Sequence, residues 1–240
     1  TSTGYDWNFG INSSSNVFFD SKATAGEVRG AAYLAGTAAD AGNSITTDAG
    51  GNVYVTGSYT STGTVTLRNM DGTASAYSLP ISSGGTDMFL IKYNPAGSVI
   101  AYSYLNGNGS DSGQSITVDS SGNLYVTGSY TSTGTVTLRN LDTTASTSAY
   151  SLPISTGVTD AFLVKYNSAG SVVAYSYIPT TSSDSGQSLV VDSSGNLYYT
   201  GYYYGGSGAI TIRNLDTTAS TSSYSLAGGV PQSVFIIKYN

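Results

Sequence analysis

The sequence predicts an all-β protein of short antiparallel strands arranged in repeated units. Residues that favour strands are abundant, among them 21 tyrosines, while 30 glycines separate short runs of alternating apolar residues. No segment carries a helical period. Only 9% of residues are charged. This does not indicate disorder, because disordered segments are usually rich in charge and poor in aromatic residues.

The repeat has a period of about 72 residues and begins at Asp40, Asp111 and Asp184. The first strand of each copy ends at an aspartate, and a tight turn follows in which Gly122 or Gly195 is expected to adopt a positive φ. A second strand, N-L-Y-V-T-G, leads into a hairpin formed by T-V-T-L-R-N and A-Y-S-L. The third strand is A-F-L-V-K-Y-N and the fourth is S-V-V-A-Y-S-Y.

Two blocks of the repeat, G-N-L-Y-V-T-G and D-A-F-L-V-K-Y-N, resemble the bacterial β-propeller repeat known as SBBP. The resemblance covers residues 40–240 and implies four-stranded antiparallel blades around an axis. It implies no particular activity. The hairpin between the second and third strands departs from the family pattern.

The first 39 residues are predicted to be a partial unit. Residues 25–40 align without a gap on residues 169–184, so residues 27–34 are expected to form a fourth strand. Residues 16–20 resemble a third strand. The expected divisions are 1–39 for this partial unit, 40–110 and 111–183 for two complete repeats, and 184–240 for a third repeat without its last strand.

An unpaired strand edge can pair with another chain, and about three blades are too few to close a ring. We therefore expect the N-terminal region of one copy to complete the last unit of another, giving a filament or a closed homo-oligomer. The alternative is that residues 27–34 fold back within their own chain. The expected assembly residues are Val17, Phe18, Phe19, Val28, Tyr33, Leu34, Phe235, Ile236, Ile237 and Tyr239.

Catalysis is not expected. The chain has no histidine or cysteine, which excludes Ser-His-Asp and Cys-His machinery, and we expect no cofactor and no metal. Most aspartates recur at equivalent repeat positions, which favours roles in turns and caps. The D-S-S-G-N loops offer one carboxylate each, so they are turns rather than calcium loops. Arginine and lysine columns are expected to form ion pairs or exposed strand flanks.

The stretch L-Y-Y-T-G-Y-Y-Y-G-G supports a second hypothesis, a carbohydrate-binding adhesin. Tyrosine rings stack on sugars, so Tyr199, Tyr202, Tyr203 and Tyr204 are candidate ligand residues. The alternative is that alternate rings pack against a neighbouring blade or subunit. Asn12 and Asn108 begin N-x-S sequons and are glycosylation candidates.

A net charge of −6 argues against nucleic acid as a partner, because phosphate binding needs clustered lysine and arginine. No apolar run is long enough to cross a bilayer. The first residue is Thr1, as expected if a leader was removed. We expect a secreted or cell-surface structural protein, with the adhesin as the competing hypothesis and surface glycans as its partners.

Overall fold

The computed structural model describes residues 7–11, 17–21, 28–155, 158–206 and 208–240. Over these ranges all regular secondary structure is β, and every strand pair is antiparallel. The predicted all-β antiparallel fold is confirmed. Within the same ranges, no helix could span a bilayer. The described strands form small separate sheets and no closed ring.

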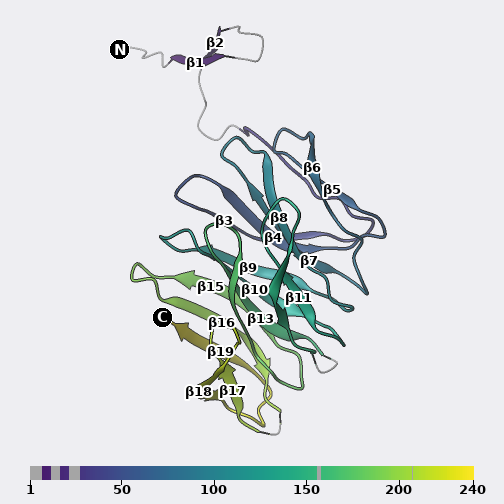
Figure 1. Ribbon diagram of the computed structural model, residues 1–240, viewed down its shortest axis with the longest axis vertical. Helices are drawn as coiled ribbons and strands as arrows, with labels where there is room; N and C mark the ends of the chain where they lie inside the picture. Colours follow the sequence, from purple (N-terminus) through teal and green to yellow (C-terminus); the bar gives the residue numbers. More distant parts are fainter. Residues whose placement is uncertain (1–6, 12–16, 22–27, 156–157, 207) are drawn as a thin grey trace.

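Three sheets follow one another along the body of the molecule (Figure 1). In each, neighbouring strands occur in chain order. The first contains β3 (Ala41–Thr47), β4 (Val53–Tyr59), β7 (Asp87–Tyr93) and β8 (Val99–Leu105). The second contains β9 (Ser112–Val118), β10 (Leu124–Tyr130), β13 (Asp160–Tyr166) and β14 (Val172–Tyr177). The third contains β15 (Ser185–Val191), β16 (Leu197–Tyr204) and β19 (Gln232–Tyr239).

A hairpin interrupts each sheet between its second and third strands and forms a two-stranded sheet of its own, as the sequence predicts. The three hairpins are β5 (Val65–Arg68) with β6 (Ala74–Leu79), β11 (Val136–Arg139) with β12 (Thr147–Leu152), and β17 (Ile210–Arg213) with β18 (Thr221–Leu226). We call each larger sheet with its hairpin a unit, numbered first to third along the chain.

The N-terminal strands are β1 (Trp7–Ile11) and β2 (Val17–Ser21), which pair with each other and with no other described strand. The predicted third strand at residues 16–20 thus coincides with β2, but its partner was wrongly expected. We assigned it to a sheet with residues 27–34, whereas the structure pairs it with Trp7–Ile11. The sequence W-N-F-G-I has no counterpart in the repeats, so self-comparison could not find this partner.

The turn after the first strand has the predicted geometry. In the first unit the Asp48 carboxylate accepts hydrogen bonds from the backbone N–H groups of Gly50 and Asn52, at 2.9 and 3.0 Å. Gly122 and Gly195 adopt φ values of 80° and 84°. An L side chain is disfavoured at such φ, which explains why glycine stands at these positions.

Neighbouring units pack face to face through alternating strand residues. Leu90 of the first unit shares a buried cluster with Ile116 and Val126 of the second. Leu163 of the second unit shares another with Phe235 of the third. The second sheet is therefore covered on both faces, whereas the first and third units each present one face on which no other unit of the described chain lies.

Candidate functional site: an open groove beside the last strand

In the first two units the fourth strand lies between the third strand and the hairpin of the same unit. β8 pairs with β7 and contacts β6, and β14 pairs with β13 and contacts β12. Tyrosine pairs mark the hairpin contact. The rings of Tyr77 and Tyr102 lie 6.0 Å apart, and those of Tyr150 and Tyr175 lie 6.1 Å apart.

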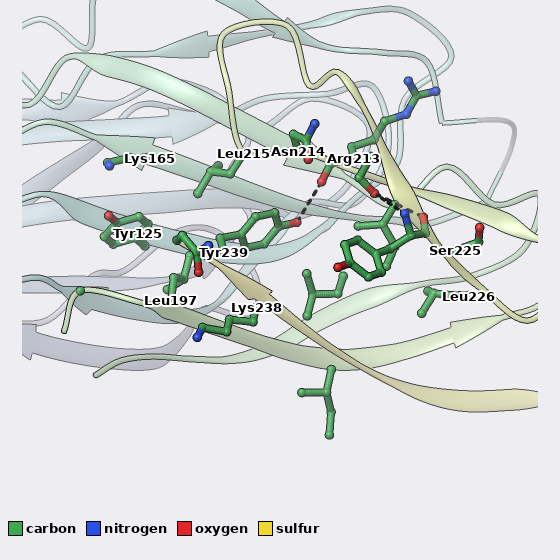
Figure 2. A pocket seen from close by; sticks show the side chains of 17 residues that line it. Tyr125, Lys165, Leu197, Arg213, Asn214, Leu215, Ser225, Leu226, Lys238 and Tyr239 are labelled. Carbon is green, nitrogen blue, oxygen red and sulfur yellow. Dashed lines mark hydrogen bonds between the residues drawn. The ribbon is translucent and has the colours of Figure 1, made fainter. Parts of the chain in front are cut away.

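In the third unit the equivalent position is an open groove of about 840 Å³ between β19 and the hairpin β17–β18 (Figure 2). β19 pairs with β16 on one side, and none of the described strands pairs with its other edge. Its backbone groups on that edge are therefore available to another strand. The residues that line the groove include Leu215, Tyr224, Leu226, Ile237, Lys238 and Tyr239.

The side chains of the third hairpin that line the groove are more exposed than the equivalent side chains in the hairpins of the first two units. Tyr224 is 74% exposed, whereas Tyr77 and Tyr150 are half-buried against their fourth-strand tyrosines. Leu226 is half-buried, whereas Leu79 and Leu152 are fully buried. The groove is thus lined by the residues that a fourth strand covers in the first two units.

Residues 28–40 contact the first unit as a fourth strand contacts the unit that follows it. The Arg68 guanidinium lies 5.2 Å from the Tyr33 ring centre, as Arg139 lies 4.5 Å from Tyr104. Tyr33 and Tyr104 align at the same repeat position. The prediction of a fourth strand at residues 27–34 is wrong for its described part, because residues 28–34 form no strand. Val28 and Tyr33 are 82% and 58% exposed.

The end of this segment is held by the contacts that begin each repeat. The Asp40 carboxylate accepts from the backbone N–H groups of Gly36 at 2.6 Å and Thr60 at 3.0 Å. Asp111 accepts from Gly107 and Thr131 at the same distances. Over residues 28–40, the alignment on the fourth-strand region of the second unit therefore has a structural counterpart in these contacts.

The expected assembly residues separate into different environments. Phe235 and Ile237 are 1% and 6% exposed, and the Phe235 ring lies 4.8 Å from Tyr199. These two side chains belong to the core between the second and third units, so neither offers an exposed side-chain contact. Their backbone groups belong to β19, which borders the groove, and their role in strand pairing stays a prediction. Ile236 points the other way and is 76% exposed. The Tyr239 hydroxyl donates to the Arg213 carbonyl at 3.2 Å.

The expected tyrosine platform is not formed by all four residues. Tyr199 and Tyr203 are 1% and 4% exposed and belong to the core, so they cannot stack on a sugar. Tyr202 and Tyr204 lie on the other face, edge to face at 6.4 Å. Alternate rings of this stretch therefore pack against the neighbouring unit, as the alternative to a sugar-binding role predicts.

Of the two sequons, Asn12 lies outside the described residues. Asn108 is exposed, and its side chain bridges to the next loop. Its amide oxygen accepts from the Thr133 backbone N–H at 2.8 Å.

The lysine and arginine columns lie over tyrosine rings, an interaction that differs from the expected ion pairs and exposed strand flanks. Lys92, Lys165 and Lys238 lie 5.1, 5.2 and 5.7 Å from the ring centres of the tyrosines on the adjacent strand. Such cation–π contacts are worth about 0.5–1 kcal/mol at exposed sites.

Buried aspartates lie at the two junctions between units. The Asp111 N–H donates to the Thr86 carbonyl at 2.7 Å, which brings Asp111 beside Asp87. The same bond from Asp184 to Thr159 brings Asp184 beside Asp160. Asp111 and Asp184 are caps, as predicted.

Asp87 and Asp160 differ from the other repeated aspartates in their hydrogen bonding. Their side chains are 0% and 3% exposed, and one carboxylate oxygen of each has no hydrogen-bond partner among the described residues. Burial and the facing carboxylate raise the pKa of Asp87 to about 7 and that of Asp160 to about 8. The sequence shows that aspartate recurs at these positions, but no pattern in it predicts that the two side chains are buried.

Comparison with known proteins agrees with this architecture. Residues 103–132 match the family model of the SBBP beta-propeller repeat. The chain is also similar to an uncharacterized WD repeat-containing protein of Acanthamoeba polyphaga mimivirus, with 29% identity over 212 residues. That match covers 83% of this chain and 15% of the viral protein, so the chain spans a small part of its relative's length.

Proposed function

We propose, from the premise that this chain carries the SBBP beta-propeller repeat, that it is a secreted, non-enzymatic structural protein that self-assembles by strand completion. The groove between β19 and the hairpin β17–β18 is the observation that carries the proposal. It has the surface that a fourth strand covers in the other units. Filling it with a strand satisfies the open edge of β19 and covers Tyr224.

The occupant is residues 28–34 of a second copy. Val28, Tyr33 and Leu34 align with Val172, Tyr177 and Ile178, which belong to the fourth-strand region of the second unit. In its own chain this segment contacts the first unit on one side. Its other side is exposed and is available to β19 of another copy. Main-chain hydrogen bonds would supply affinity and the side-chain pattern would supply register, as in other cases of strand addition.

Secretion is proposed from composition alone. A chain with few charges and many Ser, Thr, Tyr and Gly residues suits a neutral, hydrogen-bonded assembly outside the cell.

Deletion of residues 1–36 tests strand completion. We expect the full chain to form oligomers whose mass is a multiple of 24.6 kDa, and the deletion variant to be monomeric, because the donor segment is gone. Light scattering coupled to size-exclusion chromatography measures both masses.

A shorter deletion, of residues 1–27, is the matched control because it retains the donor segment. It should assemble like the full chain. An oligomeric state that survives removal of residues 1–36 would contradict the proposal.

The assembly is also expected to persist at high salt. Its contacts are backbone hydrogen bonds and neutral side chains, which do not depend on charges that ions screen within about 3 Å at 1 M salt. The measurement is the oligomer mass in 0.1 M and 1 M sodium chloride. Dissociation in 1 M salt would indicate an interface held by exposed ion pairs instead.

A further inference from the structure

Contacts between neighbouring units repeat with the period of the sequence. The Ile116 N–H donates to Ser44 Oγ at 3.2 Å, and the Leu189 N–H donates to Ser115 Oγ at 3.1 Å. In both junctions a first-strand serine of one unit accepts from the first strand of the next. The hydrogen bonds therefore define one register for joining units.

A glycine and a threonine meet beside each of these hydrogen bonds. A Cβ atom on Gly113 would lie 2.0 Å from Thr56 Oγ1, and one on Gly186 would lie 2.0 Å from Thr127 Oγ1. Both threonines are fully buried. Glycine is thus required at these positions by the close approach of the preceding unit.

The first unit presents the same groups with no unit against them. A Cβ on Gly42, the counterpart of Gly113 and Gly186, meets nothing within 4 Å. Ile45, the counterpart of the buried Ile116, is 65% exposed. We call this surface, defined by Gly42 and Ile45, the front face.

The third unit presents the complementary groups. Ser188, Thr200 and Ile236 lie in register across β15, β16 and β19. Ser188 is exposed and Ile236 is 76% exposed, whereas Leu90 and Leu163, the counterparts of Ile236, are fully buried. We call the surface defined by these three residues the back face.

Neighbouring units make different contacts at their first strands and at their fourth strands. First strands of neighbouring units contact each other directly, whereas the hairpin of the following unit lies against each fourth strand. The Tyr102 N–H donates to the Asp142 carbonyl and the Tyr175 N–H to the Asp216 carbonyl, both in hairpin loops. We expect this extra structure on the outer side of each junction to curve the array around an axis, as in a propeller.

We infer that two copies close head to tail into a six-blade ring, with the back face of each on the front face of the other. The inference rests on the proposed strand completion and adds its register and stoichiometry. Gly42 of one copy would meet Thr200 of the other, and the Ile45 N–H would donate to Ser188 Oγ. Two copies of three units give six blades, within the usual range of about four to eight, and three copies give about nine, outside it.

The charge pattern agrees with closure at this junction. Inside the chain, Asp111 faces Asp87 and Asp184 faces Asp160. At the closing junction Asp40 would face Ser233, which stands at the repeat position of Asp87 and Asp160. The like-charge pair found at both internal junctions is therefore absent from the junction between copies.

The substitution Gly42→Val tests the register. We expect wild-type protein at twice the chain mass of 24.6 kDa, and a dissociation constant raised about 100-fold or more by Gly42→Val, because the added side chain overlaps Thr200 of the partner copy. Gly63→Val is the matched control, since a Cβ there also meets nothing within 4 Å, and it should remain dimeric. Light scattering gives the masses, and circular dichroism checks folding.

A second variant tests the opposite face independently. Ser188→Arg blocks the back face and should also be monomeric. Mixing it with Gly42→Val leaves one intact face on each chain, so a dimer with a single junction should reappear.

The failures of the two proposals are distinguishable. Filaments or larger oligomers that disappear on deletion of residues 1–36 would overturn the ring while supporting strand completion. An unchanged dimer in Gly42→Val would overturn the register. A wild-type chain that is monomeric at all concentrations would overturn both.

Discussion

Gly186→Ala is expected to destabilise the chain by about 3 kcal/mol, at the upper end of what overpacking usually costs. The new methyl group would lie 2.0 Å from Thr127 Oγ1 and 2.6 Å from the Tyr199 hydroxyl. Neither neighbour can withdraw freely, because Thr127 donates to the Phe162 carbonyl and both side chains are buried. Urea denaturation followed by circular dichroism measures the loss.

The control is Gly63→Ala, the same change at a glycine outside the faces by which two copies are expected to join. Its methyl group meets nothing within 4 Å in the chain, so the stability of the folded monomer should change little. Equal losses in the two variants would show that the cost comes from the backbone preference of glycine and not from the junction between units.

Raising the pH from 4.5 to 8 is expected to reduce stability by several kcal/mol. Burial raises the pKa of Asp87 to about 7 and that of Asp160 to about 8, above the ordinary value of 3.8. Between those values the folded state holds more protons than the unfolded state, so stability falls as pH rises. Each pKa unit corresponds to about 1.4 kcal/mol.

The substitutions Asp87→Asn and Asp160→Asn each remove part of this penalty, because burial also raises the pKa of the facing carboxyls, Asp111 to about 7 and Asp184 to about 6. Asparagine keeps an acceptor oxygen for the Ser83 N–H that binds Asp87 at 3.0 Å. Each variant should be more stable than wild type at pH 8, by about 2–4 kcal/mol, and nearly equal to it at pH 4.5. Urea midpoints at the two pH values measure the difference.

Asp71→Asn is the control for net charge. Asp71 is exposed, and hydrogen bonds from the Thr73 hydroxyl and N–H hold its pKa below the ordinary value. Removing its charge should therefore produce no gain at pH 8. A gain equal to that of Asp87→Asn would show that overall charge, and not burial at the junction, controls the pH dependence.

Below about pH 4 the opposite trend is expected from other aspartates. Hydrogen bonds from Ser220 and Thr218 lower the pKa of Asp216 to about 2. A group with a lowered folded pKa stabilises the fold above its unfolded pKa, and that contribution disappears as pH falls through the folded value. The raised and lowered groups together place maximum stability near pH 4–5.

The sequence by itself determined the elements and their local geometry. The repeat, the four-strand order, the inserted hairpin and the positive φ of Gly122 follow from short-range patterns of alternation and turn chemistry. The alignment of residues 25–40 with residues 169–184 likewise identified the segment that contacts the first unit like a fourth strand.

Only the tertiary structure decided which side chains are buried. In S-V-F-I-I-K-Y every position from Val234 to Ile237 is apolar, so alternation cannot say which face is covered. The structure buries Phe235 against the second unit and exposes Ile236, because a neighbouring unit lies on one face alone. The burial of Asp87 depends in the same way on contacts with the following unit, whereas the pairing of β2 with β1 is a local hairpin whose first strand has no counterpart in the repeats.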